Sequence, residues 1–458
     1  MLGKRGGGCH RGGVTEASPV HAITPTPPTS PLAIPAYRLF WAARFAAVFA
    51  TTAMVVVIGW QTYDVARASY HMTRDHAAFQ LGLLGLVQFV PLLVLTPVAG
   101  WAADRFDRRY VGAASNLTDM LVAVALCLAT ALHWLTLPLL FTLAALHGIA
   151  RVFSGPALGS IAPNLVPPAL LPRAIAINSM AWQSASVIGP AAGGLIYAFS
   201  PALPYGLAAA LLVASAVALL ALPLMKRPEL AKHIHPLRQM AEGLKFVRNE
   251  RFLLGCITLD LFAVLLGGAT ALLPVYARDI LHVGPQGLGT MRAAPALGAA
   301  LVAVILAIRP IEREVGTRML WAVVVFGVAT VVFGISRNYV LSLAMLGVLG
   351  AADMVSVFIR STLVQLNTPD VMRGRVSSVS GLAISASNEL GEMESGGLAA
   401  LLGSTGAVVF GGVGAIVVTA IWAVIFPELK RARNFAPQYR DSSPQDNHAF
   451  EPAKEPVS

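Results

Sequence analysis

Long apolar runs alternate with short polar segments along most of this chain. The longest runs cover residues 45–60, 81–103, 121–132, 207–225 and 297–308. A helix needs about 20 mostly apolar residues to cross the hydrocarbon core of a bilayer. The pattern therefore predicts an all-α integral membrane protein with twelve transmembrane helices. Their expected ranges are 37–63, 79–103, 111–132, 136–160, 174–198, 204–225, 252–276, 286–308, 319–335, 339–366, 376–401 and 405–426.

The longest internal polar segment, residues 226–251, divides the membrane region into two halves of six helices each. A shift of 202 residues aligns the halves and pairs Pro167 with Pro369, Arg173 with Arg375, Gly189 with Gly391, and Gly194 with Gly396. Internal symmetry of this kind is typical of transporter folds built from repeats. We expect two pseudo-symmetric six-helix bundles, 37–225 and 252–426, a central loop at 226–251, a disordered tail at 1–36 and a second tail at 427–458.

The charged residues support a membrane protein and exclude a nucleic-acid-binding one. The chain is 56% hydrophobic and 12% charged, whereas soluble domains carry about 25% charged residues. Its net charge of +10 is unevenly distributed, because loops and tails on one side hold 24 Lys and Arg against 4 on the other. This is the positive-inside pattern. We expect a multi-pass protein of the cell membrane with the central loop and both tails in the cytoplasm.

The sequence holds no pattern that predicts catalysis or a cofactor. Cys9, Cys127 and Cys256 are too scattered for a disulfide framework or a metal site. No P-loop and no spacing of a nucleophile and a base occurs. We therefore expect a protein that is not an enzyme, binds no metal or cofactor, and works as a monomer in the lipid bilayer.

The segment "GWAADRFDRR", residues 100–109, follows the second predicted helix. Gly100 allows close helix approach because it lacks a Cβ, and Asp104 lies one turn later on the same face. Arg105, Arg108 and Arg109 crowd the turn into the third helix. A positive-inside anchor would explain the arginines, but it would not explain the spacing from Gly to Asp.

This G-x-x-x-D-R-x-x-R-R pattern resembles the signature loop of the major facilitator superfamily, and the resemblance covers about residues 37–426. It implies the major facilitator fold of six plus six helices. It also implies that Gly100, Asp104, Arg105, Arg108 and Arg109 help to hold the two bundles in one state of an alternating-access cycle. Asp107 departs from the family pattern, which often has Gly at that position.

The segment "ASVIGPAAGG", residues 185–194, combines a smooth helix face with a possible kink at Pro190. A plain packing helix would account for Gly189, Gly193 and Gly194. The segment also resembles a motif of proton-coupled exporters in the same superfamily, with Ala185 in place of the first Gly. Longer stretches resemble the branch that contains exporters of enterobactin and of drugs. The resemblance favours efflux by proton antiport.

Four charged residues, Arg44, Arg151, Asp260 and Asp353, lie one each on the first, fourth, seventh and tenth predicted helices. The family resemblance implies that these helices line the central cavity. The two arginines of the first half and the two aspartates of the second could then form ion pairs between the bundles, and a proton on either aspartate would weaken those pairs. Structural pairs without a transport role are the alternative.

Three carboxylates, Glu389, Glu392 and Glu394, lie within the eleventh predicted helix. Glu389 and Glu392 share a face, and two neighbouring buried carboxylates should not both ionise. They are candidates for carrying a proton, or for a structural hydrogen-bonded site. Arg292 on the eighth helix could meet Glu392 or Glu394, and we interpret Asp119 as a structural residue.

The sequence thus favours a secondary active transporter that exports a small organic molecule, siderophore-like or drug-like, in exchange for protons. An importer or facilitator of a small metabolite on the same fold is the alternative. The cavity residues leave the charge of the cargo open, because the arginines suit anions and the aspartates suit cations.

Overall fold

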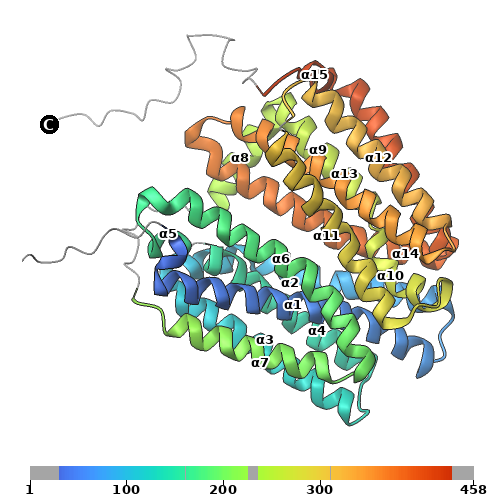
Figure 1. Ribbon diagram of the computed structural model, residues 1–458. Helices are drawn as coiled ribbons and strands as arrows, with labels where there is room; N and C mark the ends of the chain where they lie inside the picture. Colours follow the sequence, from blue (N-terminus) through green and yellow to red (C-terminus); the bar gives the residue numbers. More distant parts are fainter. Residues whose placement is uncertain (1–29, 160, 225–235, 310, 436–458) are drawn as a thin grey trace, which may run out of the picture.

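The computed structural model describes residues 30–159, 161–224, 236–309 and 311–435, and the described part is helical without strands (Figure 1). The expected tails at 1–36 and 427–458 therefore lie mostly outside the described residues. The N half contains a 3₁₀ turn at Pro31–Ala33 and the helices α1 (Pro35–Ala68), α2 (Arg74–Arg105), α3 (Arg108–Ala131), α4 (Leu137–Gly159), α5 (Ala162–Leu165), α6 (Leu171–Phe199) and α7 (Leu203–Leu220).

The C half begins with α8 (Pro236–Asn249), a helix within the expected central loop. Its remaining helices are α9 (Arg251–Leu266), α10 (Leu273–Val275), α11 (Gly284–Ile308), α12 (Val315–Ile335), α13 (Tyr339–Leu366), α14 (Asp370–Ile425) and α15 (Pro427–Arg431). Short turns η3 (Ala269–Leu272) and η4 (Tyr276–Ile280) flank α10. Each expected span coincides with described helical residues over most of its length, and ten of the described helices are long and apolar enough to cross a membrane.

Two spans differ from the expectation in shape. The eleventh and twelfth predicted helices join as α14 through a bend at Gly403, whose φ of 74° is one that glycine adopts readily. The seventh predicted helix is interrupted, since α9 ends at Gly267 and the chain turns through η3 before α10. A Cβ on Gly268 would lie 2.6 Å from the Ser395 hydroxyl, so the interruption packs closely against α14.

The two halves touch each other mainly through two helix pairs, α2 with α14 and α6 with α11. Glycines make both crossings close. A Cβ on Gly82 would lie 2.9 Å from Gly396 Cα, and a Cβ on Gly194 would lie 2.7 Å from Gly289 Cα. Gly194 and Gly396 are the pair that the 202-residue shift aligned, so the repeat marks the places where each half contacts the other.

The halves meet at one end of the molecule and diverge at the other (Figure 1). We call the end that holds α5, α8 and α15 the terminal end, because α1 begins there and α15 ends the described chain there. The opposite end, at α10, is called the far end. The glycine crossings lie toward the far end, so that a space between the halves is left toward the terminal end.

Candidate functional site

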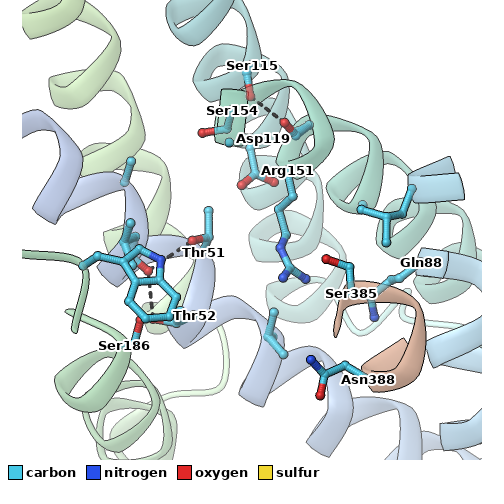
Figure 2. Close-up of a pocket in the computed structure, with 18 of the residues that line it drawn as sticks. Thr51, Thr52, Gln88, Ser115, Asp119, Arg151, Ser154, Ser186, Ser385 and Asn388 are labelled. Carbon is cyan, nitrogen blue, oxygen red and sulfur yellow. Dashed lines mark hydrogen bonds between the residues drawn. The ribbon is translucent and has the colours of Figure 1, made fainter. Parts of the chain in front are cut away.

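A cavity of about 730 Å³ lies between the halves. Arg44 on α1 and Arg151 on α4 line it from the N half, and Glu389 and Glu392 on α14 line it from the C half. Uncharged polar side chains fill much of the remaining wall. Figure 2 labels eight of them, Thr51, Thr52, Gln88, Ser115, Ser154, Ser186, Ser385 and Asn388.

The cavity continues toward the terminal end. A second pocket of about 450 Å³ shares Arg151, Gly155 and Ser385 with the first, and it extends to Gly100 and Arg375. Gly100 lies near the end of α2 and Arg375 near the start of α14, so these residues lie beside the mouth. The space beside Arg151 therefore continues toward the terminal end.

The far end is closed by contacts between the halves that converge on Asp279 of η4. The Tyr63 hydroxyl donates a hydrogen bond to Asp279 Oδ2 at 2.6 Å. The Nε atoms of Arg67 and Arg74 lie 3.3 Å and 3.6 Å from the same oxygen. Arg278 pairs with Asp64 on α1 at 2.5 Å. Because Asp279 receives three groups of the N half, it is the centre of a cluster of contacts between the halves, called the far-end lock below.

The N-half wall holds a buried hydrogen-bonded pair that the sequence alone did not predict. Asp119 on α3 accepts from His147 Nδ1 on α4 at 2.6 Å, and the two residues are 2% and 0% exposed. Asp119 also lines the cavity. His147 precedes Arg151 by one helical turn, and that spacing is the sequence signal that could have drawn attention to it.

The C-half wall carries a second pair. Arg292 on α11 lies 3.6 Å from Glu392, one of the two partners that the sequence suggested. Arg292 also donates to the Thr270 carbonyl at 2.7 Å. Thr270 belongs to the η3 interruption, and its carbonyl also accepts from the Leu273 backbone N. The irregular backbone thus helps to position a charged residue on the cavity wall.

Asp260 and Asp353 do not lie where the sequence placed them. Asp260 on α9 forms an ion pair with Arg360 on α13, inside the C half. Asp353 shares a small internal pocket with Asp260 and is absent from the cavity lining. The expected pairing of these aspartates with Arg44 and Arg151 is therefore corrected. The physical reason is helix rotation, which turns both aspartates toward a neighbouring helix of their own bundle.

The residues of the 100–109 motif make their described contacts inside the N half. Asp107 caps α3 by accepting from the Arg109 backbone N at 3.0 Å, and its carboxylate pairs with the Arg109 guanidinium at 2.9 Å. Arg109 is 4% exposed and also donates to the Leu222 carbonyl, which joins α3 to the end of α7. The departure at Asp107 thus has a structural role. Arg105 lies over the Trp101 ring, at 5.5 Å.

Gly100 is the member of that motif expected to allow close helix approach. A Cβ on Gly100 would have no atom within 4 Å, so the close approach expected there is not made. The Asp104 side chain falls outside the described residues, and Arg108 lies beside Arg109 at the start of α3. The open mouth explains Gly100, since α2 and α14 have separated where it lies.

The glycines of the 185–194 motif lie in two different contacts. Gly189 and Gly193 face α1, where a Cβ on Gly193 would lie 3.0 Å from the Ala53 carbonyl. Gly194 faces α11 of the other half, with the Pro285 carbonyl 2.5 Å from its Cβ position. Pro190 lies within α6 and lines the cavity. The 185–194 segment therefore packs against α1 within the N half and also contacts α11 of the C half.

The family model described as "Transmembrane secretion effector" (MFS_3) matches residues 26–458. The chain belongs to this family of the major facilitator superfamily. Relatives in the same superfamily include the "Enterobactin exporter EntS" of Escherichia coli O139:H28 and of Escherichia fergusonii. Each is 26% identical over 405 residues, which cover 88% of this chain and 95% of the relative.

Solved structures of major facilitator transporters show the same fold. A mutant of the nucleoside transporter NupG aligns with a TM-score of 0.66 at 12% identity, over 85% of this chain and 100% of that chain. A bacterial homologue of the human lysosomal transporter Spinster gives 0.66 at 16% identity, over 87% and 97%. A D-xylose-proton symporter gives 0.65 at 12% identity, over 86% and 98%.

Proposed function

We propose that this transporter exports a small organic molecule by alternating access and takes protons inward in exchange. The observation that carries the proposal is the polar cavity between the halves, which continues toward the terminal end and stops at the far-end lock. The positive-inside pattern supports a cytoplasmic terminal end. Cargo would then enter from the cytoplasm and leave after the far-end lock opens.

The direction of transport is supported by two features. The relatives named above are enterobactin exporters, and the 185–194 segment resembles a motif of proton-coupled exporters. The cavity volume falls within the range of about 300–1,000 Å³ that holds drug-sized ligands. We therefore propose a siderophore-like or drug-like cargo.

The proton would be carried by Glu389 and Glu392. Both line the cavity from α14, three residues apart, and like charges so close favour a shared proton. Glu392 also lies at a contact between the halves, because a Cβ on Gly85 of α2 would lie 2.9 Å from Glu392 Cβ. A change in the charge of Glu392 would therefore act where the bundles meet.

Transport by inside-out membrane vesicles tests the proposal, with enterobactin and a panel of cationic and anionic drugs as probes. Acidifying the vesicle interior, which corresponds to the cell exterior, is expected to drive uptake of at least one probe. Glu389→Gln or Glu392→Gln should reduce that stimulation about tenfold or more. Glu312→Gln, in an exposed loop, is the matched control and should leave it unchanged.

Two outcomes would reject parts of the proposal. An uptake rate that does not change with the pH gradient would rule out proton antiport. Accumulation of a metabolite in right-side-out vesicles, without uptake into inside-out ones, would identify an importer on the same fold.

A further inference from the structure

The cavity wall carries six charged side chains. Which of them are already paired decides whether the cavity favours an anionic or a cationic cargo. They are Arg44, Asp119 and Arg151 from the N half and Arg292, Glu389 and Glu392 from the C half. Charges that already have partners contribute little to recognition of a ligand. The unpaired ones remain available to bind it.

Three of the six charges are already paired. Arg292 lies 3.6 Å from Glu392, and Asp119 lies 2.6 Å from His147. These contacts give Arg292 and Glu392 partners on the C-half wall and give Asp119 a partner on the N-half wall. Neither pair offers a free charge to a molecule in the cavity.

The remaining three charges are Arg44, Arg151 and Glu389. Within the part of the chain that the structure describes, none of them forms an ion pair within 4.0 Å. Arg44 Nε is buried without a hydrogen-bond partner among those residues. Figure 2 shows the Arg151 guanidinium extending into the cavity on the side of Ser385 and Gln88. Two guanidiniums without a described ion-pair partner thus face one such carboxylate, so the unpaired groups of this cavity carry more positive than negative charge.

The two carboxylates that could have favoured a cation lie elsewhere. Asp260 and Asp353 sit inside the C half, with Asp260 paired to Arg360. The sequence left both signs of cargo open, and the position of these aspartates removes the reason to expect a cation.

We infer that the cavity binds a small organic anion, with Arg44 and Arg151 holding its charged oxygen atoms. Guanidinium groups donate in a planar fork that matches carboxylate, phosphate and similar oxyanions. Ser385, Gln88 and Asn388 supply hydrogen bonds to the rest of the cargo. This inference rests on the proposal that the cavity carries a cargo, and it specifies the chemical class of that cargo.

The anionic charge also suits the direction of export. The interior of a cell is electrically negative, so the membrane potential drives an anion outward. An anion that leaves in exchange for an entering proton would be driven by both the potential and the pH gradient.

Equilibrium binding to the purified protein tests the inference with two dyes of one xanthene scaffold. Fluorescein is anionic at neutral pH and rhodamine 123 is cationic, so the pair separates charge from shape. Fluorescence polarisation is expected to show fluorescein binding at least tenfold tighter than rhodamine 123. Arg44→Gln and Arg151→Gln should each weaken fluorescein binding about tenfold or more, because a charge-assisted hydrogen bond is lost. Glu389→Gln should strengthen it.

Controls separate site binding from general electrostatics and from misfolding. Arg248→Gln removes one exposed positive charge from α8 and should leave the affinity unchanged. Arg151→Lys keeps the charge and should retain part of the affinity even if the Gln variant folds poorly. Tighter binding of rhodamine 123, no binding of fluorescein, or fluorescein affinity unaffected by both Arg→Gln changes would overturn the inference.

Failure of this inference and failure of the proposed function give different results. Binding to purified protein does not depend on direction or on a gradient. Fluorescein bound at the arginines without gradient-driven transport would reject antiport alone. Gradient-driven transport of cationic probes only would reject the anionic cargo alone.

Discussion

The residue that ties the N-half wall together is His147, which has no exposed surface and holds the Asp119 carboxylate at 2.6 Å. A carboxylate without a partner inside a membrane bundle is costly. The hydrogen bond from His147 removes that cost for Asp119. Ser115 supports the same wall by donating to the Ala150 carbonyl at 2.6 Å (Figure 2). Arg151 is therefore presented to the cavity from a wall in which Ser115 and Asp119 both have hydrogen-bond partners.

Replacing His147 with Ala is expected to leave the Asp119 carboxylate buried and unpaired. Breaking a buried pair in this way costs about 3–5 kcal/mol, which should lower the thermal midpoint of the detergent-solubilised protein markedly. The double change Asp119→Ala with His147→Ala should cost less than the sum of the two single changes, because the residues share one interaction.

His76→Ala is the matched control, since His76 is exposed at the start of α2 and its side chain has no described partner. Its effect should stay within about 0.5 kcal/mol. Single changes whose costs simply add would show that Asp119 and His147 do not stabilise each other.

At the scale of elements, α2 and α14 touch near the far end and separate near the terminal end. Gly82 lies against Gly396 and Gly85 against Glu392, which sets an antiparallel register for the pair. In that register Gly100 would come opposite the segment around Gly381, but a Cβ on either glycine meets no atom within 4 Å. The glycines near the mouth therefore have no close neighbour in this state. They leave room for α2 and α14 to close on each other in another state.

Gly396→Leu and Gly100→Leu should therefore fail in different ways. Gly396→Leu would overpack the crossing with Gly82, lower stability by about 1–3 kcal/mol and stop transport. Gly100→Leu should leave the thermal midpoint nearly unchanged, because its side chain has room in this state, and yet abolish transport by keeping the mouth from closing.

Thermal melts and vesicle transport measured on the same preparations check both outcomes. Gly397→Leu is the control, since it neighbours Gly396 and has no atom within 4 Å of its Cβ position. A Gly100→Leu protein that transports normally would argue against closure of α2 on α14.

The sequence predicted the positions of the helices well and the directions of their charged side chains poorly. Apolar run lengths located all twelve spans, and the repeat located Gly194 and Gly396 at the crossings between halves. The direction in which a charged side chain points depends on the rotation of its helix, which an apolar pattern without a polar face does not define. For that reason Asp260 was expected on the cavity but pairs with Arg360, and His147 was not singled out.

At the scale of the whole molecule, the two ends are in opposite states. The far end is held by the lock on Asp279, and the cavity continues past Arg151 to the mouth beside Gly100. Alternating access requires these states to exchange, so that one end opens as the other closes. The lock lies near the ends of the helices. Loss of the Asp279 charge there removes the ion pairs with Arg67 and Arg74 together.

The most direct test of this account is the distance between spin labels at each end, measured by double electron–electron resonance with Asp279→Asn. Labels at Tyr70→Cys with Val340→Cys report the far end, and labels at Leu224→Cys with Ile308→Cys report the terminal end. All four positions are exposed, and the native cysteines would be replaced first. Asp279→Asn is expected to lengthen the far-end distance and shorten the terminal-end distance in the same molecules. Distances that stay unchanged, or that change in the same direction at both ends, would contradict alternating access controlled by the far-end lock.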